Sequence, residues 1–335
     1  MAVKSARSIL ITVMFIGVTM SLPSECEAES KRVALGISAL SAVYAPLFIA
    51  KDVGLFEKYG LDVDVILISA GPIVHGILAG DVKAAGAGAS RIVASNLEGS
   101  GILMLAATND RMPYMLIVPP EIKNPSQLKG KTVGVAEYGG LDDTAMRYAL
   151  LQMGLTPDKD VTVIQAGGKG TRFSALQQRA IAAIVIDPPY TLQAKQLGLN
   201  FLFDFLKSSP KTVYGTLAAK DSYIKQNPEI IQGLLKSLVS GVQYYKTHKP
   251  ESIKIMAKYM RVDLPAKAAE MEETYNVFVN TAKCKPYVDT EGVQNLLNEL
   301  GRKIPKARTA SPQSFVDMRF IKELDESGFI DSVCQ

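Results

Sequence analysis

The stretch RVALGISALSAVYAPLFIAKDVGLFEKYGLDVDVILISAG, residues 32–71, predicts how the fold of this 335-residue chain begins. Arg32 to Ile37 is a short apolar run, typical of a buried strand. Pro46 suits the first turn of a helix, where its missing N–H would have no partner, and Gly54 can end that helix in the left-handed conformation. Asp62 to Ile68 alternates charged and apolar residues before it becomes wholly apolar, which indicates a strand half solvated at its start and buried at its end. The stretch therefore predicts a βαβ unit.

The same alternation of apolar runs and amphipathic segments continues through the first two thirds of the chain. Further strands are predicted at residues 82–89, 102–107, 114–118, 132–136, 161–165, 181–186 and 201–205. Strands that alternate with helices at this spacing are typical of a doubly wound, mainly parallel α/β sheet.

Two places in the sequence indicate that the chain passes between two lobes. Pro119 and Pro120 end one strand, and the polar segment 124–131 follows. The chain then returns near Thr212, and after Ala219 the strand signals give way to helices. We therefore expect two lobes joined by two crossing strands: lobe 1 from residues 29–119, lobe 2 from 120–213, and a return to lobe 1 with C-terminal helices from 214–335.

The amino terminus has the features of a secretory signal peptide. Lys4 and Arg7 precede a short apolar core, Ile9 to Met20, and small residues lead to a cleavage site after Ala28. We therefore predict a signal peptide at residues 1–28 and a periplasmic or other extracytoplasmic location. Composition agrees with a globular protein, at 47% hydrophobic and 21% charged residues. The net charge of +4 is carried by interspersed basic and acidic residues, so we expect no nucleic acid as a partner, and we expect a monomer.

The cysteines predict one disulfide bond. Cleavage after Ala28 leaves Cys284 and Cys334 as an even pair in an exported chain, the setting in which disulfides form. Two thiols with only two histidines, His75 and His248, make a poor metal site, so we expect no metal and no cofactor.

The loops that follow the predicted strands all lie at carboxyl ends, where open α/β sheets bind ligands. Two lobes would present these loops to one cleft. They supply the candidate ligand-binding residues Ser41, Tyr44, Ser69, Gly71, Ser90, Tyr138, Gly139, Gly140, Asp142, Thr144 and Asp187, with Tyr214 at the return to the first lobe.

The paired Gly139 and Gly140 lead into a helix and predict free backbone N–H groups at its positive end. Such a site suits a carboxylate, sulfonate or phosphate group. Asp142 and Asp143 would partly cancel that positive end. Two interpretations stay open: the carboxylates only cap the helix, or the ligand also carries an amine or amidine.

Catalytic motifs do not emerge from the sequence. Residues 166–171, AGGKGT, look superficially like a phosphate-binding loop, but Gly170 separates Lys169 from Thr171, and the NTPase pattern requires them adjacent. No Ser/His/Asp or Cys/His set has enough members. We expect no enzymatic activity.

Four short motifs, in this order and spacing, resemble one family of solute-binding proteins. They are GLFEKYGLDV at residues 54–63, LAGD at 78–81, LKGKTVG at 128–134 and GLTPDKDV at 154–161. The chain resembles the solute-binding proteins of ABC importers, in the branch for sulfonates, nitrate, taurine and thiamine pyrimidine precursors. The resemblance covers Arg32 to Met260 and departs at residues 178–182, QRAIA, where the family usually has Gly and Asp.

The resemblance implies a two-lobed fold of the periplasmic-binding-protein type (type II). It also implies a receptor that closes its lobes on a small polar or anionic organic solute and delivers it to an ABC permease and its ATPase in the membrane. Two alternatives stay open: an enzyme on the same fold, of the thiamine pyrimidine synthase type, and the ligand-sensing lobe of a membrane receptor. The export signal and the positions of the three cysteines, 26, 284 and 334, argue against the enzyme.

Overall fold

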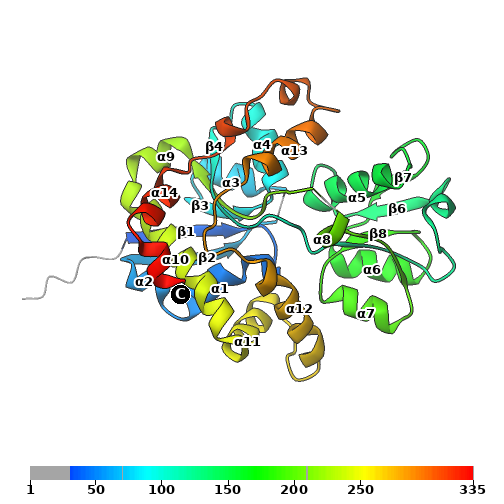
Figure 1. The fold of residues 1–335 in the computed structure, drawn as a ribbon, viewed down its shortest axis with the longest axis horizontal. Helices are drawn as coiled ribbons and strands as arrows, with labels where there is room; N and C mark the ends of the chain where they lie inside the picture. The colour runs from blue at the N-terminus through cyan, green and yellow to red at the C-terminus, as the bar shows by residue number, and fades with distance from the viewer. Residues whose placement is uncertain (1–30, 70, 209, 335) are drawn as a thin grey trace, which may run out of the picture.

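The computed structural model describes residues 31–69, 71–208 and 210–334, so the predicted signal peptide lies outside the described residues. These residues form two lobes, each built on a five-stranded sheet (Figure 1). The strands of the first sheet are β1 (Lys31–Ile37), β2 (Leu61–Leu67), β3 (Ala84–Ala87), β4 (Ile102–Asn109) and β10 (Tyr214–Lys220). Those of the second are β5 (Met115–Val118), β6 (Thr132–Val135), β7 (Thr162–Gln165), β8 (Ile184–Ile186) and β9 (Asn200–Asp204).

The two sheets share one topology, which agrees with the predicted fold class. Their strand orders are β2-β1-β3-β10-β4 and β7-β6-β8-β5-β9. Strand β1 is parallel to β2 and β3, as β6 is to β7 and β8. In each sheet the fourth strand is antiparallel to its neighbours, β10 to β3 and β4, and β5 to β8 and β9. This strand is the one that arrives from the other lobe, so it starts at the edge where the parallel strands end and must run the opposite way.

Helices cover the faces of both sheets. The first lobe contains η1 (Ala42–Tyr44), α1 (Ala45–Asp52), α2 (Leu55–Lys58), α3 (Ile73–Ala79) and α4 (Ala89–Leu97). The second contains η2 (Pro125–Leu128), α5 (Leu141–Gln152), α6 (Lys169–Gln177), α7 (Tyr190–Gln196) and α8 (Phe205–Ser208). The carboxyl-terminal part contains α9 (Asp221–Gln226), α10 (Pro228–Thr247), α11 (Lys249–Met260), α12 (Ala268–Thr281), α13 (Thr290–Leu300), η3 (Pro305–Arg308), η4 (Pro312–Phe315), α14 (Arg319–Glu326) and α15 (Phe329–Val333).

The first crossing between the lobes comes earlier than the sequence analysis predicted. Strand β5 was placed in the first lobe, with the boundary after residue 119, but it pairs with β8 and β9 of the second sheet. The prolines at 119 and 120 end a strand of the second lobe. The crossing is the segment between Asn109 and Met115, and it lies beside the return segment, where the Thr212 N–H donates to the Asp110 carbonyl (2.9 Å). An apolar run indicates a strand but not the sheet that it joins.

The carboxyl-terminal helices pack mainly on the first lobe, as expected for helices without a sheet of their own. Helix α10 packs against α1 so closely that a side chain at Gly241 would overlap the backbone of Pro46. Helix α12 extends toward the second lobe, where Glu273 pairs with Lys195 of α7 (3.0 Å; Figure 1). This part of the chain therefore belongs to the first lobe and also contacts the second.

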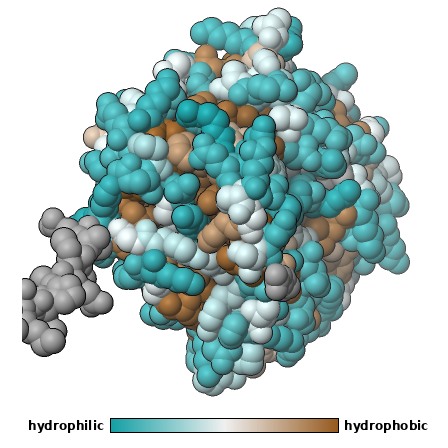
Figure 2. Space-filling view, turned by 60° about the vertical axis from the view of Figure 1, so that its left-hand side comes forward, coloured by the Kyte–Doolittle hydropathy of each residue, from teal (hydrophilic) through white to brown (hydrophobic). Residues whose placement is uncertain are grey.

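Strand β2 is exposed at the end that was predicted to be buried. It lies at the edge of the sheet, where Leu61 and Val63 are buried and Ile66 and Leu67 are 40% and 47% exposed. The prediction was wrong because β2 is an edge strand, paired on one side only, and an apolar run does not reveal that position in the sheet. Elsewhere hydrophilic residues cover most of the face seen in Figure 2, and hydrophobic residues show in separate areas.

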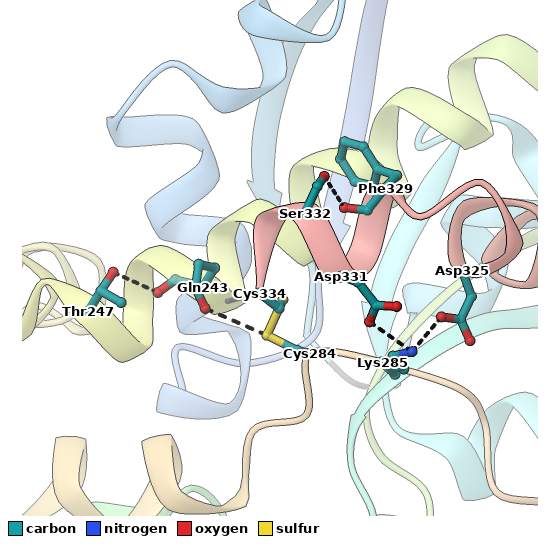
Figure 3. The surroundings of a disulfide bond; sticks show 9 residues. All are labelled: Gln243, Thr247, Cys284, Lys285, Asp325, Phe329, Asp331, Ser332 and Cys334. Atoms are coloured by element: carbon teal, nitrogen blue, oxygen red, sulfur yellow. Dashed lines mark hydrogen bonds and ion pairs between the residues drawn. A yellow bond between two sulfur atoms is a disulfide. The ribbon is translucent and has the colours of Figure 1, made fainter.

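A disulfide bond joins Cys284, in the segment after α12, to Cys334, which follows α15 (Figure 3). The two Cα atoms are 6.1 Å apart. Beside the bond, the Lys285 ammonium lies between Asp325 and Asp331, at 2.7 and 2.9 Å. The bond and these ion pairs hold the last helix of the described chain against the first lobe. Nowhere in residues 31–69, 71–208 and 210–334 is a helix both long and apolar enough to cross a membrane.

Candidate ligand-binding cleft

A cleft of ≈ 550 Å³ lies between the two lobes, at the carboxyl ends of the parallel strands in both sheets. The first lobe lines it with the loop after β1, the start of α4 and the segment after α11. The second lobe lines it with the loop before α5, the start of α6 and the residues around Pro188 and Pro189. Its position is the one predicted from the order of the strands.

The structure brings only part of the predicted set together in this cleft. Ser41, Tyr44, Ser90, Gly140, Asp142 and Tyr214 line it. Asp187 is fully buried beside it, Thr144 lines a smaller pocket at the crossing segments, and Gly71 lines a shallow hollow between α3 and α4. Ser69 is exposed, and Gly139 does not line the cleft. Tyr138 is 49% exposed, and its hydroxyl donates a hydrogen bond to the Val163 carbonyl.

Buried tyrosines form part of the cleft wall where the crossing segments enter the lobes. The Tyr44 hydroxyl is hydrogen-bonded to Ser38 (2.9 Å), and burial raises the pKa of Tyr44 to about 12 although that hydrogen bond lowers it. Burial, followed by the charge of Asp187, raises the pKa of Tyr114 well above its ordinary value. Burial, followed by Tyr114, does the same for the pKa of Tyr214. All three hydroxyls are therefore neutral at physiological pH.

The Gly139–Gly140 loop uses its backbone N–H groups within the second lobe. The Gly139 N–H donates to the Asp143 carboxylate (2.8 Å), and the Gly140 N–H donates to the Glu137 carbonyl (3.2 Å). The free backbone N–H groups predicted at this loop are therefore not present, because both N–H groups already have partners. The glycines do fit a sharp turn, because Gly139 has a φ of 77°.

The two carboxylates after this loop are paired inside the second lobe. Asp142 accepts from the Ala136 N–H (2.5 Å) and from the Arg172 guanidinium. Asp143 accepts from the Arg147 Nε (2.7 Å) as well as from Gly139. Neither residue occupies the N-cap position of α5, which is Gly140. Both open interpretations therefore need revision: the carboxylates neutralise arginines and backbone groups of their own lobe.

Two basic residues that the sequence analysis did not select line the cleft at the start of α6. Lys169 pairs with the buried Asp187 (2.5 Å), and Arg172 pairs with Asp142. The sequence could have indicated this position, because residues 166–171, AGGKGT, follow the carboxyl end of a strand and lead into a helix. The NTPase pattern alone does not reveal such a site.

An ion pair closes one edge of the cleft. Arg91 of α4 and Glu137 of the second lobe approach to 2.8 Å. This contact is an ion pair and not a hydrogen bond, because the Arg91 Nη2 has no hydrogen-bond partner among the described residues. Nearby, a side chain at Gly88 would touch Leu141 of the second lobe. The structure therefore shows the lobes in contact across the cleft.

Besides Nη2 of Arg91, which has only its ion pair, three polar groups of the cleft lack a hydrogen-bond partner among the described residues. They are the hydroxyls of Ser41 and Ser90 and the Nε of Arg172, all of them buried. Burying an unpaired polar group costs about 1–3 kcal/mol, so such groups mark where a ligand would supply partners. Among residues 31–69, 71–208 and 210–334, no cluster of side chains could hold a metal ion.

Two similar lobes, two crossings and one cleft between them define the two-lobed fold of periplasmic solute-binding proteins. The chain belongs to the NMT1/THI5 like family, whose pattern matches residues 41–252. A protein of Brucella abortus (strain 2308), provisionally named as a binding protein, is 31% identical over an alignment of 251 positions, and the match covers 72% of this chain and 76% of the relative.

Solved structures confirm the fold. One from Bordetella bronchiseptica RB50 superposes with a TM-score of 0.76 at 20% identity and covers 89% of this chain and 98% of that chain. The alkanesulfonate-binding protein SsuA of Xanthomonas axonopodis pv. citri, bound to MOPS, superposes with a TM-score of 0.69 at 16% identity and covers 85% of this chain and 96% of that chain.

Proposed function

We propose that this chain is an extracytoplasmic solute-binding receptor of an ABC importer. It captures a small polar or anionic organic solute between its lobes and presents the closed form to a membrane permease driven by an ATPase. The observation that carries the proposal is the cleft itself, because both lobes contribute buried polar groups without partners, Ser41 and Ser90 from the first and Arg172 from the second.

The arrangement of the lobes supports a closing motion. Among the described residues, only the segments near residues 110–114 and 210–213 connect them, and changes of backbone torsion in two such segments suffice for a hinge. The cross-cleft pair Arg91–Glu137 forms only while the lobes are together. Binding that favours the closed form would thus change the shape that a permease meets.

The lining of the cleft favours binding over catalysis. Its residues include no histidine and no cysteine, and its lysine and arginines are held in ion pairs with carboxylates. We therefore propose a receptor and not an enzyme of the thiamine pyrimidine synthase type. The predicted signal peptide supports the proposed location outside the cytoplasm.

A ligand screen combined with scattering tests this function. Thermal shifts would be measured with sulfonates, aromatic carboxylates, nitrate, amines and pyrimidines, since a ligand at about 100 times its Kd stabilises the fold by about 2.7 kcal/mol. Small-angle scattering with each hit should show a smaller radius of gyration. A set of hits that all leave the radius unchanged at saturation would contradict a closing receptor.

A further inference from the structure

We infer that the anionic head of the solute, a sulfonate, phosphate or carboxylate, binds at the amino terminus of α6, with Arg172 and Lys169 as the side chains that hold it. This inference rests on the proposed receptor function and specifies where in the cleft an oxyanion lies. It replaces the Gly139–Gly140 loop, whose N–H groups are occupied within the lobe.

The start of α6 presents its first turn to the cleft. Its N-cap is Gly168, which supplies no side-chain cap, and Gly168, Lys169 and Gly170 all line the cleft. A helix of nine residues has uncompensated N–H groups and a partial positive charge at this end. A Cβ at Gly168 would meet no atom within 4 Å, so the space in front of the helix is open.

Arg172 is the independent observation that points to a ligand. Arg172 is 2% exposed and lines the cleft, and its Nε has no hydrogen-bond partner among the described residues. Its Nη1 is held by Asp142, which in turn accepts from the Ala136 N–H. The Asp142 pairing therefore holds the guanidinium while its Nε donor stays unpaired, as suits an oxyanion that takes several hydrogen bonds.

The charges around this position are balanced before a ligand arrives. Lys169 is opposed by Asp187, and Arg172 by Asp142. Such a site binds an oxyanion through directed donors and the helix dipole rather than through excess charge. We therefore expect its affinity to depend more on the geometry of the α6 terminus than on ionic strength.

The opposite wall of the cleft suits the rest of the solute. From the first lobe, Met260, Val262 and the unpaired hydroxyls of Ser41 and Ser90 line it, while Tyr190 and Pro189 line the cleft on the side of α6, where Tyr190 packs against Phe173. A solute with an oxyanion at one end and an apolar or aromatic body would contact both lobes at once.

A pair of variants at Gly168 tests the oxyanion site without weakening the fold. The residue has φ −64° and ψ 170°, which any L-residue adopts, so Gly168→Asp places a carboxylate at the N-cap, where it stabilises the helix and competes with the anion. Gly168→Ala adds only a methyl group. Methanesulfonate, inorganic phosphate and acetate, each titrated against chloride at equal ionic strength, should show which head group binds wild type, and Gly168→Ala measures the effect of an added methyl group without a charge. Gly168→Asp should bind that group at least about tenfold more weakly.

A second pair separates Arg172 from general charge effects. Arg172→Lys retains the charge opposite Asp142 but loses the Nε donor and should lose anion binding. Arg179→Gln removes an arginine at the other end of the same segment, paired with Glu121, and should leave anion binding unchanged. Equal binding by wild type, Gly168→Asp and Arg172→Lys would overturn the assignment, as would no binding of any of the three anions to wild type.

These outcomes are distinct from a failure of the receptor function. If solutes from the screen still bind and close the lobes while Gly168→Asp retains full affinity for them, the receptor stands and the α6 site is wrong. If the anions bind as expected at α6 but no bound solute closes the lobes, the site stands and the receptor proposal fails.

Discussion

Arg91 of the first lobe and Glu137 of the second form an ion pair across the edge of the cleft, with Nη2 and Oε1 2.8 Å apart. Their side chains are 23% and 35% exposed, so the pair is partly screened by water. It couples the two lobes directly, because Arg91 belongs to α4 of the first lobe and Glu137 to the second. The stability of the closed form should therefore depend on this pair.

We predict that Arg91→Ala and Glu137→Ala each weaken solute binding by about two- to fivefold, because a partly exposed ion pair contributes about 0.2–1 kcal/mol. The double variant should be no weaker than either single one. A double-mutant cycle by calorimetry measures the coupling. The control is Asp64→Ala, which removes an exposed pair with Arg32 inside the first lobe and should leave affinity unchanged. Full additivity of the two cleft variants would show that the pair does not act as a unit.

The unpaired serines give a prediction in which stability and binding change in different directions. Ser90→Ala removes a buried hydroxyl that has no partner among the described residues, so the unliganded protein should keep or gain thermal stability. Solute affinity should fall by about two- to tenfold, from the loss of one hydrogen bond of about 0.5–1.5 kcal/mol. Thermal unfolding with and without solute measures both. Reduced stability of the unliganded variant would mean that the hydroxyl serves the fold.

The disulfide predicts a large effect on stability. It closes a sequence separation of 50 residues, and the chain-entropy model assigns about 4 kcal/mol to a loop of that length. Cys284→Ser with Cys334→Ser should lower the unfolding free energy by an amount of this order in urea titrations, with solute affinity unchanged. Non-reducing digestion and mass spectrometry of exported protein should find the two cysteines in linked peptides. Two thiols that alkylate in the native exported protein would rule the bond out.

The buried tyrosines predict a loss of stability in alkali. Burial raises the pKa of Tyr44 from about 10 in an unfolded chain to about 12, so folding favours its neutral form. The resulting stability is fully present below about pH 10 and is lost as the pH rises through about 12. Urea titrations from pH 8 upward should show the unfolding free energy falling across this window.

Tyr44→Phe removes the titrating group and serves as the comparison. The unfolding free energy of Tyr44→Phe should fall less steeply across the same window. The loss in wild type should exceed the loss in the variant by an amount on the order of 2–3 kcal/mol. Each protein is compared with its own unfolding free energy at pH 8, because loss of the hydrogen bond to Ser38 lowers the stability of Tyr44→Phe at every pH. Parallel curves for the two proteins would contradict a raised pKa at Tyr44.

Local patterns in the sequence were sufficient to predict the two-lobed α/β fold and part of its cleft. Apolar runs alternating with amphipathic segments indicate parallel strands and helices, and in such sheets the carboxyl-end loops meet at one edge. That rule alone placed Ser41, Ser90 and Asp142 in one cleft, although they are far apart in the sequence. An even number of cysteines after cleavage likewise predicted a pair at Cys284 and Cys334.

Only the tertiary structure decided which groups of the cleft are occupied and which are free. Arg172 and Asp142 are 30 residues apart, and their pairing decides that the carboxylate is neutralised while the guanidinium Nε stays unpaired. The same holds for strand β5, whose apolar residues fit either sheet equally well. Periodicity indicates which face of a helix or strand is apolar, and even then β2 shows that an apolar end is exposed at the edge of its sheet. The partner that a buried polar group or strand acquires depends on contacts between distant segments, which the local pattern does not specify.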